Sequence, residues 1–132
     1  MEVRDDLRYT REHEWVRREG GEFVVGITDY AQEQLSDIVF VELPAVGTAL
    51  AAGAAFGSVE AVKAVSDLFA PLSGAVTAVN AALGDDPAQV NRSAYDEGWM
   101  VRARIANPSE WDGLLTAEQY RGLLKELGGA GA

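Results

Sequence analysis

The chain has 132 residues, a length typical of a single domain with one hydrophobic core. It contains no cysteine, which excludes disulfide bonds, thiolate metal sites and a cysteine nucleophile. Its formal net charge of -10 disfavours nucleic-acid binding, which needs clustered Lys and Arg, and favours partner proteins with positive surfaces.

Short strands separated by turn residues dominate the first two-thirds of the sequence. A two-glycine loop, Gly20–Gly21, separates the strand-like segments EWVRR and FVVGI and predicts a β-hairpin. A short helix is expected at about 29–35, with Asp29 as its N-cap and Gln32 three residues later, as in a capping box. The β-forming run DIVFVEL then predicts a strand that stops at Pro44.

The segment WMVRARI alternates between apolar and polar residues and predicts a strand with one buried and one solvent-facing side. The expected buried side comprises Trp99, Val101, Ala103 and Ile105. The expected solvent side comprises Met100, Arg102 and Arg104.

The C-terminal part is predicted to be helical. One helix is expected to begin with Asn107 as N-cap and Pro108 at the first helical position. A second is expected to begin at Thr116 and to end before Gly128, with Lys125 in its last turn, where a cation suits the helix dipole. The residues of its apolar stripe are Tyr120, Leu123, Leu124 and Leu127. Many short strands followed by such helices favour a small β-sandwich or flattened barrel.

Lysine is scarce in this chain, since only Lys63 and Lys125 are lysines among 11 basic residues. Lys63 lies between a strand-like segment that ends near Ala61 and one that begins near Leu68, which places it near a hairpin tip in solvent. A lysine amine can be acylated, whereas an arginine guanidinium stays protonated and is a poor nucleophile. The alternative is an ordinary surface lysine.

The neighbours of Lys63 favour modification of its amine. Val62 and Ala64 are small and leave the amine accessible to a modifying enzyme, and Glu60 and Asp67 provide acidic borders for recognition. By contrast, no HExxH, GxSxG or phosphate-binding loop is present, and His13 is the only histidine. The sequence therefore predicts no catalytic residues and no metal site.

Five blocks of the sequence resemble the H protein family of the glycine cleavage system, whose members are lipoyl carriers. These blocks are YTREHEWV at Tyr9–Val16, the long segment Val25–Gly47, the lipoylation-like motif VEAVKAVSD at 59–67, Val90–Asn91 and Gly98–Met100. Their order and separations match the family across nearly the whole chain. One departure is Ser36, which stands where the family often has glycine.

The resemblance implies a mainly β fold: a hybrid barrel-sandwich of two antiparallel sheets, with the short helix near 29–35 and the C-terminal helices. It also implies that residues 1–132 form a single lipoyl-carrier domain. The core of that domain would span about 7–105 and its C-terminal helical segment about 107–128.

The resemblance further implies a non-catalytic carrier with lipoic acid joined to Lys63 as N6-lipoyllysine, in a motif that includes Glu60, Val62, Ala64 and Asp67. The implied cargo is the aminomethyl group of glycine. The implied partners are the pyridoxal-phosphate-dependent glycine decarboxylase (P protein), the tetrahydrofolate-dependent aminomethyltransferase (T protein), dihydrolipoamide dehydrogenase (L protein) and a lipoylating enzyme. The sulfur atoms that bind the cargo then belong to the cofactor, which suits a chain without cysteine.

A loaded lipoyl arm would have to be shielded from water and its cationic amine would need carboxylates. Glu14 and Asp67, which lie in matching family blocks, are candidates for this arm pocket, together with Glu12. The alternative is that all three are ordinary solvated charges.

Three other functions are compatible with an exposed lysine of this kind. A biotin carrier is disfavoured because Val62 and Ala64, rather than methionines, flank the lysine. An H-like lipoyl-relay protein would donate lipoate to other enzymes, and an unmodified scaffold would carry no lipoyl group.

The first ten residues are acidic and lack a secretory apolar core, and no apolar run approaches the roughly 20 residues of a membrane span. We therefore expect a cytoplasmic protein without membrane contact; a mitochondrial location would require a presequence that had been removed.

Overall fold

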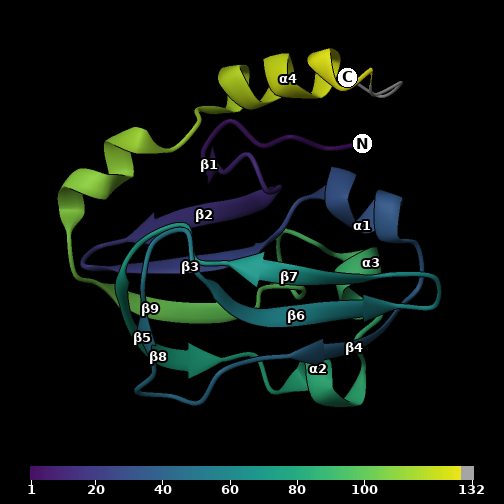
Figure 1. Cartoon of the computed structure of the whole chain (residues 1–132), viewed down its shortest axis with the longest axis horizontal. Coiled ribbons are helices and arrows are strands. Elements are labelled where there is room, and N and C mark those ends of the chain that lie inside the picture. The colour runs from purple at the N-terminus through teal and green to yellow at the C-terminus, as the bar shows by residue number, and fades with distance from the viewer. Residues whose placement is uncertain (129–132) are drawn as a thin grey trace.

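Two antiparallel sheets form the framework of the computed structural model, which describes residues 1–128 (Figure 1). The larger sheet has the order β1-β2-β3-β9-β8-β5, with bounds β1 Arg8–Tyr9, β2 Glu14–Glu19, β3 Glu22–Ile27, β9 Val101–Ile105, β8 Gly74–Val79 and β5 Ala49–Leu50. The smaller sheet has the order β4-β6-β7, with bounds β4 Ile38–Glu42, β6 Ala55–Ala61 and β7 Val65–Phe69. The helices are α1 Asp29–Leu35, α2 Ala82–Asp85, α3 Gln89–Arg92, the 3-10 helix η1 Pro108–Gly113 and α4 Ala117–Glu126. The predicted mainly β fold of two antiparallel sheets is confirmed.

Two clusters of buried side chains lie on opposite faces of the larger sheet. The first contains residues from both sheets, such as Val25 of β3 and Leu68 of β7, and forms the core between them. The second lies under α4 and includes Trp15, Val24 and Leu124. Because successive residues of a strand point to opposite faces, Val24 and Val25 serve different clusters. The central strand β3 is therefore buried on both sides.

The prediction that Met100 faces solvent is wrong, since its side chain is completely buried. Strand β9 begins only at Val101, and the Met100 side chain belongs to the inter-sheet core together with Leu83 of α2 and Val90 of α3. The expected alternation holds inside the strand, where Val101 and Ala103 are buried. The solvent side of this segment is therefore shorter than the sequence pattern predicted.

Helix α1 has the predicted bounds but not the predicted cap. Thr28, rather than Asp29, is the N-cap: it has an extended backbone and its hydroxyl accepts a hydrogen bond from the Ala31 N–H. Asp29 is the first helical residue, and its carboxylate accepts a hydrogen bond from the Gln32 side-chain amide at 2.7 Å. An extended backbone is the conformation that an N-cap requires, which is why Thr28 takes this role.

Helix α1 ends at Ser36 in a conformation that favours glycine, with φ 63° and ψ -143°. A side chain in this region strains the backbone by roughly 1–3 kcal/mol. We expect Ser36→Gly to raise the free energy of unfolding by about 1 kcal/mol, because the relief of strain exceeds the added flexibility of the unfolded chain. Urea denaturation measures the change. An unchanged or lower midpoint would show that Ser36 is not strained.

The C-terminal helices begin as predicted. The Asn107 side chain accepts the Ser109 N–H, and η1 that follows is a 3-10 helix. Thr116 and Gln119 form a complete capping box at the start of α4. Gly128 follows the helix with a φ of 70°. The predicted apolar stripe is correct for Tyr120 and Leu124, which are buried, but wrong for Leu127, which is half exposed because it lies beyond the last turn.

The Tyr120 hydroxyl fixes α4 to the rest of the protein. It forms hydrogen bonds with the Thr28 hydroxyl at 2.7 Å and with His13 Nδ1 at 2.9 Å. Its ring also stacks on the Tyr9 ring, with centroids 4.5 Å apart. The cap of α1, the start of β2 and the C-terminal helix therefore meet at one phenol.

We expect Tyr120→Phe to lower the free energy of unfolding by about 2 kcal/mol, because the buried Thr28 hydroxyl and the His13 ring each lose a partner. The ring remains, so its packing is preserved. Urea denaturation monitored by tryptophan fluorescence measures the change. A loss below about 0.5 kcal/mol would mean that water replaces the phenol without cost.

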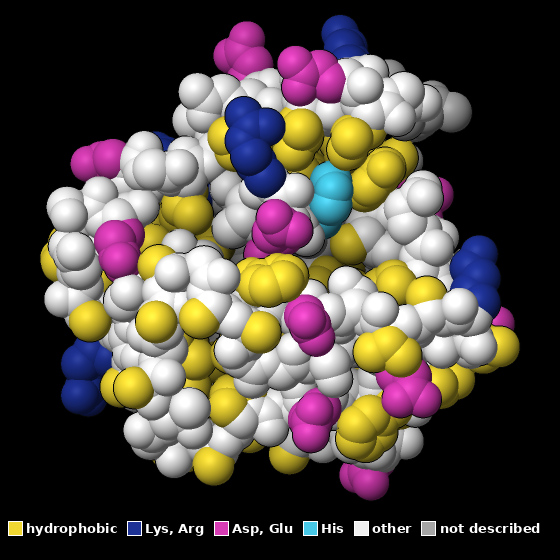
Figure 2. Space-filling view, in the orientation of Figure 1, with side chains coloured by type: hydrophobic (Ala, Val, Ile, Leu, Met, Phe, Trp, Pro, Cys, Tyr) yellow, Lys and Arg dark blue, Asp and Glu magenta, His cyan; other side chains and the backbone are white. Residues whose placement is uncertain are grey.

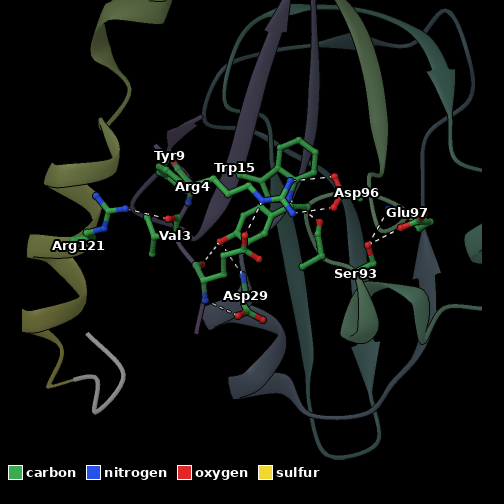
Figure 3. A network of polar contacts seen from close by, with 12 residues as sticks. Val3, Arg4, Tyr9, Trp15, Asp29, Ser93, Asp96, Glu97 and Arg121 are labelled. Carbon is green, nitrogen blue, oxygen red and sulfur yellow. Dashed lines mark hydrogen bonds and ion pairs between the residues drawn. The ribbon is translucent and has the colours of Figure 1, made fainter. Parts of the chain in front are cut away.

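The N-terminal segment is tied to three separate parts of the chain (Figure 3). Arg4 makes two hydrogen bonds with the carboxylate of Asp96, at 2.8 and 3.0 Å. The backbone N–H of Glu2 donates to Asp29 at 2.7 Å, and Arg121 of α4 donates to the carbonyl of Val3 at 3.0 Å. The N-terminal segment therefore links α4, through Arg121, to α1 and to the segment that contains Asp96.

Candidate functional site

Lys63 lies at the tip of the β6–β7 hairpin and is exposed to solvent; the tip is at the right of Figure 1. The strands remain paired up to Glu60 and Val65, and the Ala61 N–H donates to the Ala64 carbonyl at 2.7 Å. Strand β7 therefore begins at Val65, earlier than the start near Leu68 that the sequence suggested. A turn this tight presents the lysine side chain at the outermost point of the hairpin.

The hairpin tip is anchored to its neighbours. The Val62 N–H donates to the Asp37 carbonyl at 3.0 Å, and Ile38 of β4 pairs with Ala61 of β6. Neither Lys63 nor its immediate neighbours have a positive φ, so the turn needs no glycine. The backbone that carries Lys63 is therefore held by hydrogen bonds on both sides.

The motif residues around Lys63 divide between core and solvent as a strand requires. Val59 and Ala61 are buried, whereas Glu60 is exposed. On β7, Leu68 is buried and Asp67 is exposed. Val62 and Ala64 at the tip are exposed too, the Val62 side chain by 75%. Val59, Ala61 and Leu68 thus hold the hairpin on the core, and the charged residues of the motif remain available to a partner.

Lys63 is the only basic residue in a long part of the chain. Between Arg18 and Arg92 it is accompanied by ten acidic residues, namely Glu19, Glu22, Asp29, Glu33, Asp37, Glu42, Glu60, Asp67, Asp85 and Asp86. Among residues 1–128, the ion pairs of the structure do not include Lys63. The amine is therefore exposed, and this part of the sequence is otherwise acidic.

Glu14, the first candidate for the arm pocket, is a buried carboxylate that is only 2% exposed. It accepts a hydrogen bond from the Thr10 hydroxyl at 2.6 Å and one from the Phe69 backbone N–H at 3.2 Å. Glu14 begins β2 and Phe69 ends β7, so this carboxylate connects the two sheets. Burial raises its pKa to about 7, although both hydrogen bonds act in the opposite direction.

The other two pocket candidates differ from Glu14 because both Glu12 and Asp67 are exposed. No hydrogen bond or ion pair of the described chain joins the three acids directly, although the charge of Glu12 adds to the rise in the pKa of Glu14. Asp67 lies two residues before Phe69 on β7, so both residues belong to the same side of that strand. The structure thus places Asp67 two residues before the backbone N–H that bonds Glu14, with its side chain exposed to solvent.

A hollow lies beneath α4, and Figure 2 shows the single histidine, His13, inside it. The His13 ring contacts the ring of Tyr30, with centroids 4.7 Å apart, and burial lowers the pKa of the imidazole. His13 itself has a φ of 68°, which turns the chain directly before Glu14. The buried carboxylate therefore lies at a sharp bend between α4 and the two sheets.

Sequence reasoning missed two partners of this carboxylate. Thr10 was detectable in principle, because a threonine shortly before a strand often bonds the following backbone, as it does here with the N–H groups of Glu12 and Glu14. The Phe69 N–H lies 55 residues away from Glu14 in the sequence, and no local pattern announces that contact.

None of the helices in residues 1–128 combines the length and apolar character needed to span a membrane. Within these residues there is also no group of three or more His, Cys, Asp or Glu side chains arranged to hold a metal ion. The candidate site combines one exposed amine on a hairpin with one buried carboxylate between the sheets.

Comparison with known proteins assigns this arrangement to a family. Residues 7–127 match the family model described as glycine cleavage H-protein. The glycine cleavage system H protein of Geobacillus kaustophilus (strain HTA426) is 56% identical over 126 residues, which cover 96% of this chain and 99% of that protein. The glycine cleavage system H protein of Anaeromyxobacter sp. (strain K) is 52% identical, with 96% and 98% covered.

A solved structure agrees with these sequence relatives. The crystal structure of a glycine cleavage system H protein from Mycobacterium marinum superposes with a TM-score of 0.81 at 41% sequence identity, covering 91% of this chain and 97% of that one. Sequence and fold therefore agree over nearly the full length of both proteins. The chain belongs to the glycine cleavage H-protein family, the lipoylated carriers of the glycine cleavage system.

Proposed function

We propose that Lys63 carries lipoic acid in amide linkage to its Nζ atom, and that this arm shuttles the aminomethyl group of glycine. The decarboxylase (P protein) loads the arm, the aminomethyltransferase (T protein) unloads it, and dihydrolipoamide dehydrogenase (L protein) reoxidises it. The observation that carries the proposal is the exposed amine of Lys63 at the tip of an anchored hairpin. The residues present suit the group, because Val62 and Ala64 leave the amine open for acylation.

When bound, lipoate would supply a disulfide, of which one sulfur takes the aminomethyl group while the other becomes a thiol; a dithiol would remain once the cargo has left. The protein contributes the position of that arm. A hairpin fixed by the Val62–Asp37 hydrogen bond and by β4 holds the tether at one point, so the arm's end stays at high effective concentration near a docked enzyme. The carrier itself then needs no catalytic group, and its role is delivery.

We further propose that Glu14, with Asp67 and Glu12, shelters the loaded arm. A cationic amine that reaches Glu14 would meet a carboxylate whose two hydrogen-bond donors, Thr10 and Phe69 N–H, hold it in place. Burial makes an unpaired charge on Glu14 costly, so a cation would bind there more strongly than to a surface acid. Asp67 and Glu12 are exposed and would add charge at the entrance.

The decisive experiment is intact-mass measurement with peptide mapping of the protein purified from cells that can attach lipoate. The expected result is one added lipoyl group on the peptide that contains Lys63. A lipoyl group on another residue, or none, would contradict the proposal. The lipoylated protein is then mixed with glycine and glycine decarboxylase, and release of carbon dioxide is expected. If the lipoyl group is present but no carbon dioxide forms, the lipoyl-relay function is favoured instead.

A further inference from the structure

We propose that the outward face of the three-stranded sheet is the surface to which the glycine decarboxylase docks. The matching surface on the decarboxylase would be basic and have an apolar centre. This docking face is formed by Phe40 and Glu42 of β4, Glu60 of β6, Val62 at the tip, and Val65 and Asp67 of β7. The identity of the partner rests on the proposed function, whereas the face itself is a feature of the fold.

The strand register brings these residues together in two rows. Phe40 pairs with Glu60, and Glu60 pairs with Val65, so one row crosses all three strands. A second row runs from Glu42 through Ser58 to Asp67. Between the rows, Val41 of β4 and Val59 of β6 are buried in the core. Both rows therefore belong to the side of the sheet that faces away from the core.

The apolar residues of the docking face are unusually exposed. The exposed fractions are 52% for Phe40, 66% for Val65 and 75% for Val62. Single exposed apolar residues are common on protein surfaces, but these three lie on one face, next to the residue that carries the arm. An apolar group concentrated at one site on a strongly charged surface indicates a protein contact.

The acids of the docking face lack a local counter-charge. Glu60 and Asp67 form no ion pair or side-chain hydrogen bond with a basic residue in the described chain, and Glu42 bonds only Ser58 weakly, at 3.5 Å. Lys63 is the only base between Arg18 and Arg92, so nothing else in this part of the sequence offsets them. Figure 2 looks onto this side of the molecule and shows carboxylates mixed with apolar side chains over β4, β6 and β7. The complementary partner surface is therefore basic and has an apolar centre.

The charge on this face changes as the carrier works, and the change favours one partner. Acylation of Lys63 removes its positive charge, so the lipoylated but unloaded carrier presents the most negative face. Loading adds a cationic amine to the arm and so makes the carrier less negative again. A basic partner therefore binds the unloaded lipoyl form best and releases the loaded form. The enzyme that takes the unloaded oxidised form and produces the loaded one is the decarboxylase.

The test compares exposed apolar residues on and off the docking face. The double variant Phe40→Ser/Val65→Ser removes the apolar centre. Its matched control is Val46→Ser/Leu127→Ser, which changes two residues that are equally exposed, by 62% and 52%, but lie in the β4–β5 loop and after α4. Each protein is lipoylated and checked by intact mass, and its melting temperature is compared with that of the parent. Carbon dioxide release from glycine is then measured against carrier concentration.

We expect Phe40→Ser/Val65→Ser to raise the apparent KM for the carrier by about tenfold or more with kcat unchanged, since two central contacts are lost. The control is expected to change KM by less than about twofold. A separate variant, Glu42→Gln/Glu60→Gln, is expected to raise KM at low salt and to weaken its dependence on ionic strength. Equal KM values for the apolar variant and its control would overturn the proposal.

A binding titration of the unlipoylated proteins with the decarboxylase separates docking from arm chemistry. If the parent binds and Phe40→Ser/Val65→Ser binds at least about fivefold more weakly, the docking face is supported even if no carbon dioxide is released. If the double variant and the parent bind equally, the docking proposal fails although lipoylation and carrier activity persist. The two proposals are therefore refuted by different results.

Discussion

Lys63→Arg is expected to abolish lipoylation and to reduce glycine-dependent carbon dioxide release to the level seen without carrier. The guanidinium keeps the positive charge and the length of the side chain, but it stays protonated and is a poor nucleophile, so the amide to lipoate cannot form. The fold should be unaffected, because Lys63 is exposed at the hairpin tip and has no ion-pair partner among the described residues. Intact mass and the decarboxylase assay measure the two losses.

The chain offers a matched control, since Lys125 is its only other lysine. Lys125 lies in the last turn of α4, far along the chain from the hairpin, and Lys125→Arg keeps a cation at the helix C-terminus. This variant should be lipoylated and active like the parent. A lipoyl mass on Lys63→Arg, or its loss from Lys125→Arg, would move the attachment site away from Lys63.

Local signals in the sequence were sufficient for several elements of the fold. The Gly20–Gly21 loop joins β2 and β3 as predicted, and α4 begins after Thr116 as predicted, with Thr116 and Gln119 in a capping box. In both cases the interacting residues are at most three positions apart, so the pattern and the physical cause lie in the same short segment. The hairpin tip at Lys63 was also accessible to such reasoning, because strand-like segments lie on both sides of it, although β7 begins at Val65 rather than near Leu68.

Contacts between distant segments were not predictable in this way. Met100 is buried in the inter-sheet core together with residues of α2 and α3, and nothing beside it in the sequence indicates that these segments join it there. The same holds for Glu14, which looked like a solvated neighbour of Glu12 but is buried and bonded to the Phe69 N–H. A one-residue difference decided the cap of α1, since Thr28 rather than Asp29 has the extended backbone. Tertiary structure, more than residue type, set the environment of the site.

Glu14→Gln is expected to leave lipoylation intact but to make the loaded arm lose ammonia about tenfold faster or more. Glu14 lies at the far end of β7 from the hairpin tip, so the lipoylating enzyme does not need it. The buried carboxylate is the group that would hold the cationic amine, and a charged hydrogen bond of this kind contributes roughly 1.5–3 kcal/mol. Ammonia release from purified loaded carrier, measured without the aminomethyltransferase, gives the rate.

The matched control is Glu118→Gln, an exposed acid in the first turn of α4, which should leave the decay rate unchanged. Acidification offers an independent check on the parent protein. Protonation of Glu14 removes the charge that retains the amine, so the loaded form should decay faster as the pH falls, and Glu14→Gln should lack this component. Identical pH profiles for the parent and Glu14→Gln would remove Glu14 from the pocket.

The same buried carboxylate should make the folded protein less stable at high pH, which distinguishes it from an ordinary surface acid. Burial raises its pKa from 4.5 to about 7, so between these values the folded protein keeps a proton that the unfolded chain has released. The stabilisation that this retained proton provides is therefore complete below about pH 4.5 and is lost as the pH rises through about 7. In total, the free energy of unfolding falls by about 3 kcal/mol over this range. Glu14→Gln cannot ionise, so relative to the parent its free energy of unfolding should increase by that amount between pH 4 and 8. If the difference in unfolding free energy between Glu14→Gln and the parent did not change with pH, Glu14 would titrate normally in the folded protein. Charging the carboxylate would then cost nothing, and Glu14 would have little advantage over a surface acid in binding the amine.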